Sequence, residues 1–166
     1  MNINPTSRRH LISGLAGLAA ATASMNTPAA PSPAAQSAGA AADGNTSANK
    51  IVYQLNKADP EYQEEIFNSV SAMLGKFVDD ISIVLVVWGP GIHILAKNPK
   101  RPVSKLYQQR VRSMAESYGV KFIACENTMK TVGWTAKDMQ EFVEVEDFGA
   151  SAIMRLQQQG YAYLAW

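Results

Sequence analysis

Apolar positions beyond residue 49 follow two alternating periods along the chain. Short, nearly continuous apolar runs, of which residues 81–88 are the most uniform, are typical of strands covered on both faces. Between these runs, apolar residues recur every three or four positions, which indicates amphipathic helices. The alternation predicts a three-layer α/β fold, in which a five-stranded, mainly parallel sheet is flanked by helices.

The periods also predict where each element lies. Five strands are expected, with the most apolar run at the centre of the sheet: residues 51–55, 81–88, 121–125, 143–145 and 161–165. Four longer helices are expected between them: residues 60–77 after an Asp59 cap, 102–118, 135–142 and 149–159. Leu106 and Val111 are assigned to the buried face of the second helix. A short helix is expected directly after Cys125.

The first 49 residues lack this alternation. Residues 1–23 place Arg8 and Arg9 ahead of the apolar stretch 11–23 and contain no acid, so they resemble a twin-arginine signal peptide cleaved after Ala23. The alternative is a membrane anchor, but the stretch is shorter than the roughly 20 residues that a bilayer requires. We therefore expect a periplasmic protein with no stable membrane insertion after cleavage. Residues 24–49, rich in Ala, Pro and Ser, predict a disordered linker, and residues 50–166 a single folded domain.

Composition and charge exclude several classes of function for this chain. The chain has 15 Lys and Arg against 14 Asp and Glu, and loss of Arg8 and Arg9 leaves 13 against 14. Such a balance argues against binding to nucleic acid. The single Cys excludes a disulfide scaffold, and with two His residues it cannot by itself complete a zinc site. We expect no metal, and no cofactor fingerprint is evident.

The candidate site residues lie in the loops that follow the first three strands, because ligands of parallel α/β sheets bind beyond the carboxyl ends of the strands. Cys125 ends the third strand, where helix amides would stabilise a thiolate. Its residue type alone favours the alternative of a buried, inert thiol. The two roles considered for His93 are a base for Cys125 and a group that holds an anion, although a lone His is more often a surface or helix-start residue. The turn of Gly89, Pro90 and Gly91 allows close backbone approach to a ligand, or is simply a tight turn.

A basic stretch without intervening acids precedes the third strand. It could attract small anions, but the buried positions between the charges favour a solvated helix face. Its members are Lys97, Lys100, Arg101, Lys105, Arg110 and Arg112.

Four segments carry a recognisable combination of residues: VYQLN at 52–56, GPGI at 89–92, CENTM at 125–129 and RLQQQGY at 155–161. Together they resemble the DsrE/DsrF-like family, in an exported branch with a twin-arginine signal. The resemblance implies a homo-trimer or homo-hexamer and a link to sulfur metabolism. It also implies that Cys125 carries sulfur as a persulfide. The sulfur donor and acceptor proteins are unknown.

Two functions from different classes follow. The first is a periplasmic sulfur carrier or accessory protein that holds sulfane sulfur on Cys125. The groups expected to orient the donor are Asn56, Gly89, Pro90, Gly91, His93, Asn127 and Thr128. The second is a non-catalytic, oligomeric module that binds a small ligand such as an anion. A multi-turnover enzyme is the least expected, because His93 is the only further acid or base in evidence.

Overall fold

The computed structural model describes residues 46–166. The expected signal peptide, and the expected linker up to residue 45, lie outside the described residues. Among the residues described, no helix is long and apolar enough to cross a membrane.

A five-stranded sheet forms the centre of the domain, and every pair of neighbouring strands is parallel. The prediction of a parallel α/β sheet is therefore confirmed. The strand order is β4-β3-β2-β1-β5, which places the most apolar strand in the middle. The strands are β1 (Asn49–Leu55), β2 (Ile81–Val87), β3 (Lys121–Cys125), β4 (Val143–Glu146) and β5 (Ala162–Leu164).

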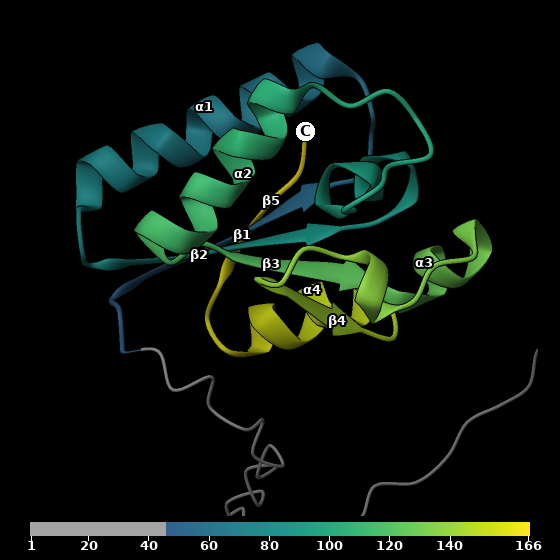
Figure 1. The fold of residues 1–166 in the computed structure, drawn as a ribbon. Coiled ribbons are helices and arrows are strands. Elements are labelled where there is room, and N and C mark those ends of the chain that lie inside the picture. The colour runs from purple at the N-terminus through teal and green to yellow at the C-terminus, as the bar shows by residue number, and fades with distance from the viewer. Residues whose placement is uncertain (1–45) are drawn as a thin grey trace, which may run out of the picture. The chain divides into compact units, whose positions relative to one another are not determined.

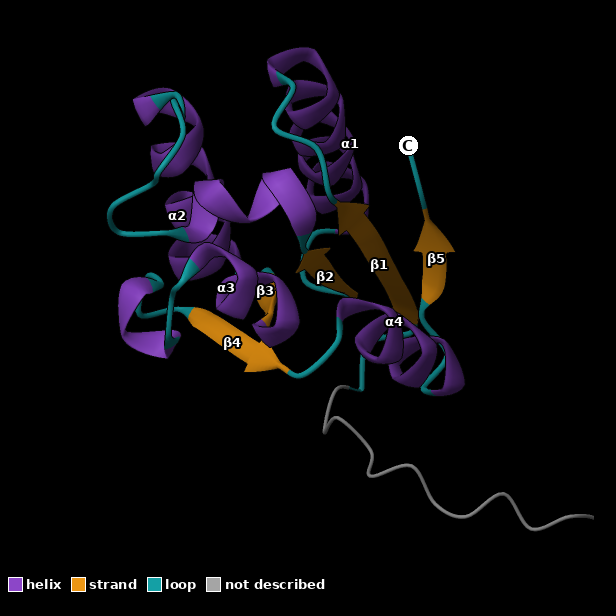
Figure 2. Ribbon diagram, turned by 90° about the vertical axis from the view of Figure 1, so that its right-hand side faces the viewer, coloured by secondary structure: helices purple, strands orange, loops and turns teal. Residues whose placement is uncertain are grey.

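Helices cover both faces of the sheet, so the three-layer arrangement is also confirmed. Figures 1 and 2 show α1 and α2 on one face and α4 on the other, with α3 beyond the carboxyl end of β3. The α-helices are α1 (Pro60–Phe77), α2 (Lys105–Tyr118), α3 (Glu126–Val132) and α4 (Gly149–Gln158). Two 3-10 helices, η1 (Gly89–Leu95) and η2 (Ala136–Asp138), complete the described part.

Side chains of successive strand residues point to opposite faces and build two separate hydrophobic clusters. In β3, Phe122 and Ala124 belong to the larger cluster under α1, α2 and η1, whereas Ile123 belongs to the smaller cluster under α4. Cys125 has the same parity as Ile123. Its side chain therefore lies on the α4 face.

The first strand begins slightly earlier than expected. The Ala48 amide donates to Asp80 Oδ1 at 3.0 Å, and Asn49 Nδ2 donates to the Asp80 carbonyl at 2.8 Å. These bonds attach the chain to the turn between α1 and β2. Asn49, the last residue of the expected linker, is thus the first residue of β1.

The helix expected at 135–142 is not formed beyond one short 3-10 turn. Thr135 and Asp138 make a capping contact, in which the Thr135 amide donates to Asp138 Oδ2 at 2.8 Å. The chain then turns extended at Met139, which forms an antiparallel bridge with Ala96 and is 1% exposed. Backbone groups of residues 138–140 form hydrogen bonds with the end of η1 and the segment after it. Because these groups already have partners, the helix does not continue.

The second helix also departs from the prediction at its start. It begins at Lys105 rather than near Pro102, and the Leu106 side chain is 67% exposed instead of buried. Val111 and Met114 do lie in the core, as their spacing predicts. The register of α2 is therefore set by its second half, and its first turn lies at the surface.

Candidate functional site

The candidate site lies at the carboxyl end of β3, where Cys125 is both the last strand residue and the N-cap of α3. The expected strand-to-helix junction is confirmed. The Cys125 side chain is nearly enclosed, since the residue is only 5% exposed. Its thiol donates to the backbone carbonyl of Asp147, with 3.8 Å between sulfur and oxygen.

The same carbonyl joins two of the expected site residues. The Asn127 amide donates to Asp147 O at 3.1 Å, so the turn between β4 and α4 is bonded to the start of α3 beside the thiol. The Asn127 side chain itself is exposed. The structure thus brings Asn127 and Cys125 together around one carbonyl oxygen contributed by a third segment.

Thr128 links α3 to the turn after β2. Its hydroxyl accepts a hydrogen bond from the Gly89 amide at 3.3 Å. Gly89 has φ +51, and a Cβ there would lie 3.2 Å from the Asn56 carbonyl oxygen. The loops after β1, β2 and β3 therefore meet at one rim, as the strand directions predict.

Two of the expected ligand-binding residues have structural partners. Asn56 Oδ1 accepts a hydrogen bond from the Tyr62 hydroxyl at 3.1 Å. A Cβ at Gly91 would lie 2.7 Å from the Leu55 carbonyl oxygen, so glycine is required there for η1 to pack on the end of β1. Pro90 is exposed. The position that a Gly91 side chain would take is thus occupied by the end of β1.

His93 lies on the other face of the sheet from Cys125. Its ring packs edge-on against Trp134, with 4.9 Å between ring centroids, and Trp134 belongs to the cluster under α1 and α2. No hydrogen bond among the described residues joins His93 to Cys125. The arrangement does not form a Cys-His pair.

A small cavity of about 40 Å³ adjoins His93, between the start of α1 and the segment before α2. Gln63, Ser104 and Tyr107 also line it. His93 is 5% exposed, and its Nδ1 has no hydrogen-bond partner among the described residues. Burial lowers the pKa of His93 below its usual value, and the nearby Arg101 and Lys100 lower that pKa further. The ring is therefore neutral near pH 7.

Two residues beside Cys125 were not among the sequence candidates. Glu146 is the register partner of Cys125 in the β3–β4 pairing, so their side chains share the α4 face. Arg155 of α4 forms an ion pair with Glu146 and also donates to Gln159 Oε1 at 3.2 Å. Glu126, the acidic residue that follows Cys125 in the sequence, instead pairs with Lys130 at 2.7 Å. Only the pairing register could have indicated Glu146.

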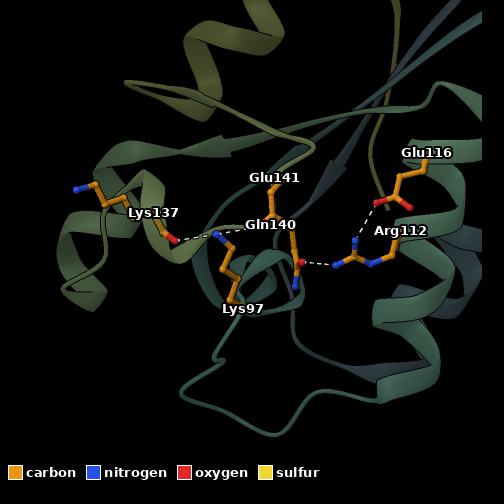
Figure 3. A network of polar contacts seen from close by, with 6 residues as sticks. All are labelled: Lys97, Arg112, Glu116, Lys137, Gln140 and Glu141. Carbon is orange, nitrogen blue, oxygen red and sulfur yellow. Dashed lines mark hydrogen bonds and ion pairs between the residues drawn. The ribbon is translucent and has the colours of Figure 1, made fainter.

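The basic stretch is largely engaged with the protein's own surface, as Figure 3 shows for Lys97 and Arg112. Lys97 pairs with Glu141 at 3.0 Å and donates to the Lys137 carbonyl at 3.1 Å. Arg112 pairs with Glu116 at 2.8 Å and donates to Gln140 Oε1 at 2.6 Å. The Arg112–Gln140 bond joins α2 to the segment after η2, and the Lys97 contacts join the segment after η1 to Lys137 and Glu141. These contacts favour the solvated-face interpretation.

Within residues 46–166, no cluster of three or more His, Cys, Asp or Glu side chains has a geometry that could hold a metal ion.

The sequence matches the model of the DsrE/DsrF-like family over residues 35–166, and the chain belongs to that family. This match covers the whole described domain, including the loops after β1, β2 and β3. Membership suggests a role related to sulfur metabolism.

Solved structures agree on the fold. A protein of unknown function from Methanobacterium thermoautotrophicum is similar with a TM-score of 0.63 and 24% identity, over 71% of this chain and 99% of that chain. The ychN protein from E. coli is similar with a TM-score of 0.55 and 16% identity, over the same shares. At these identities the likeness shows the fold alone. A search of curated proteins gave no match.

Proposed function

We propose that this protein is a periplasmic sulfur carrier or accessory protein that holds sulfane sulfur as a persulfide on Cys125. The observation that carries the proposal is the position of the chain's only cysteine. Cys125 ends β3 at the rim of a DsrE/DsrF-like domain, where the loops of three parallel strands meet. Family membership supplies the link to sulfur chemistry.

The proposed chemistry is thiol attack on a polysulfide. Cys125 loses its proton to water, and the thiolate attacks the terminal sulfur atom of the polysulfide chain. A new S–S bond forms as the attacked S–S bond breaks, and the shortened polysulfide leaves with the electron pair. Cys125 is thereby oxidised to a persulfide. In a second exchange, an acceptor thiolate can attack the outer sulfur of this persulfide, and Cys125 leaves as a thiolate.

Intact-mass spectrometry tests this step directly. After incubation with polysulfide and desalting, the folded protein should gain the mass of one or more sulfur atoms, and dithiothreitol should remove the gain. Cys125→Ser should gain nothing. Absence of an adduct on the folded wild-type protein, while a free small thiol in the same solution becomes persulfidated, would overturn the carrier proposal.

The cavity at His93 supports a second candidate function, a non-catalytic small-ligand binding module. A cavity of about 40 Å³ accepts only a molecule of a few atoms, and a buried ring nitrogen without a partner is a group that a bound ligand can satisfy. Titration calorimetry with small anions such as sulfite and formate tests it. Binding that persists in Cys125→Ser but is lost in His93→Phe would favour this module over the carrier.

The periplasmic part of the proposal rests on the signal-like residues 1–23. Fractionation of the host, followed by N-terminal sequencing, should find mature chains that begin at Ser24 in the periplasm. An intact N-terminus in the cytoplasmic fraction would contradict export.

A further inference from the structure

The burial of Cys125 places a condition on any reaction of its thiol. The residue is 5% exposed, and its S–H donates to the Asp147 carbonyl in the turn between β4 and α4. For the Cys125 thiolate to attack a sulfur donor, the donor must be able to reach the Cys125 sulfur atom. The residues that hold this turn in place therefore control how often the thiol is reachable.

The turn is attached on both of its sides. The Asn127 amide donates to Asp147 O, which fixes the turn to the start of α3. At the other side Gly149 lies against the Trp88 ring, so closely that a Cβ there would be 2.6 Å from a ring carbon. Between them, the Phe148 side chain is 57% exposed. The turn thus has few buried side chains of its own and depends on these attachments.

The ion pair between Glu146 and Arg155 links the end of β4, before the turn, to the second half of α4, after it. Glu146 is the last residue of β4, immediately before the turn, and Arg155 lies in α4 after it. Both side chains are part-buried, with 29% of Glu146 and 39% of Arg155 exposed. Since Glu146 is also the strand partner of Cys125, the pair lies beside the thiol that the turn covers.

We propose that the Glu146–Arg155 ion pair is a latch that keeps the β4–α4 turn closed over Cys125, which makes Arg155 a positioning residue for thiol reactivity. The inference rests on the proposed function only for its biological purpose. Access to the thiol is a property of the fold and can be measured without sulfur chemistry.

Alkylation kinetics with iodoacetamide separate the latch from a simple effect of charge. If the pair acted only through charge, Glu146→Gln would speed alkylation by removing a negative charge beside the thiolate. Arg155→Gln would then slow it by leaving that charge unpaired. A latch predicts the same direction for both variants, because either one releases the turn. We expect both to react about two- to fivefold faster than wild type, the range that corresponds to loss of one partly exposed ion pair.

Amide hydrogen exchange provides a readout that does not involve the thiol. The Asn127 amide bonds the Asp147 carbonyl, so its exchange reports opening of the turn. Exchange at Asn127 should accelerate in both variants and return toward the wild-type rate in Arg155→Lys, which keeps a cation. Glu141→Gln is the matched control, because it breaks the Lys97 ion pair away from the turn and should change neither rate.

Slower alkylation in Arg155→Gln, or unchanged alkylation and exchange in both latch variants, would overturn the latch. So would equal acceleration in Glu141→Gln, which would indicate general loosening of the fold. Failure of polysulfide to load wild-type Cys125 would count against the carrier function while leaving these rates as a valid test of the latch.

Discussion

Val78 adopts a backbone conformation that β-branched residues rarely accept. It caps α1 with φ 52, and its amide donates to the Leu74 carbonyl at 2.9 Å. The side chain is 67% exposed, so it gains little from burial. It lies at a groove of about 550 Å³ between α1 and α2. The fold therefore carries local strain at this helix end.

Replacing Val78 by Gly should relieve that strain. We expect Val78→Gly to raise the free energy of unfolding by about 1 kcal/mol, because glycine accepts positive φ without a steric cost. Urea denaturation at pH 7 measures this change in the free energy of unfolding. Val78→Ala, which keeps a Cβ, is the control and should gain less. A loss of stability in the Gly variant would show that Val78 packs favourably despite its exposure.

His93 should make folding stability depend on pH. Its folded-state pKa is lowered by burial and then by Arg101 and Lys100, so protonation favours the unfolded chain. The contribution of His93 to the free energy of unfolding is therefore largest above the unfolded-state pKa, about 6.5, and it decreases as pH falls below that value. Cleavage after Ala23 would leave His93 as the sole histidine, since the only other one is His10.

The measurement is urea denaturation of wild type and His93→Gln between about pH 7 and pH 5. Wild type should lose stability across this window, and the variant should have a flatter profile. Parallel profiles for the two proteins would mean that His93 does not titrate differently in the folded and unfolded states.

At the scale of elements, periodicity predicted those parts whose burial follows from their own sequence. Strand β2 is apolar at nearly every position because both of its faces are covered, and this needs no knowledge of its neighbours. Met139 shows the opposite case. Its spacing fits a helix, yet it is buried through a bridge to Ala96, more than forty residues earlier. A local pattern contains no information about such a partner.

The contact between η1 and β1 gives an element-scale prediction. Gly91→Ala should lower the free energy of unfolding by about 1–3 kcal/mol, because its Cβ would press on the Leu55 backbone. Gly75→Ala is the matched control: no atom lies within 4 Å of the added Cβ, and Ala favours the helix interior. It should stabilise by about 0.5–1 kcal/mol. Denaturation midpoints that shift in the same direction would contradict this steric role of Gly91.

At the scale of the whole domain, strand direction predicted the rim, but strand register decided which groups meet there. The loops holding Asn56, Gly89 and Thr128 do come together, because parallel strands end at one edge. The placement of Cys125 on the sheet face opposite His93 depends on the alternation of side chains along β3, and the proximity of Glu146 depends on the β3–β4 register. The apolar pattern contains neither the direction of each side chain nor the pairing register, so the sequence alone leaves the Cys-His alternative open.

Assembly of several copies remains a prediction at this scale. Several large apolar side chains are exposed in the described domain: Val78, Leu106, Tyr118, Phe148, Met154, Tyr163 and Trp166. Burying such groups between copies gains about 25 cal/mol per Å² of apolar surface, and a closed symmetric oligomer limits further growth. We expect the mature chain to be a trimer or hexamer. Light scattering at micromolar and tenfold lower concentration measures the mass, and a monomer at both would contradict the assembly expected from the family resemblance.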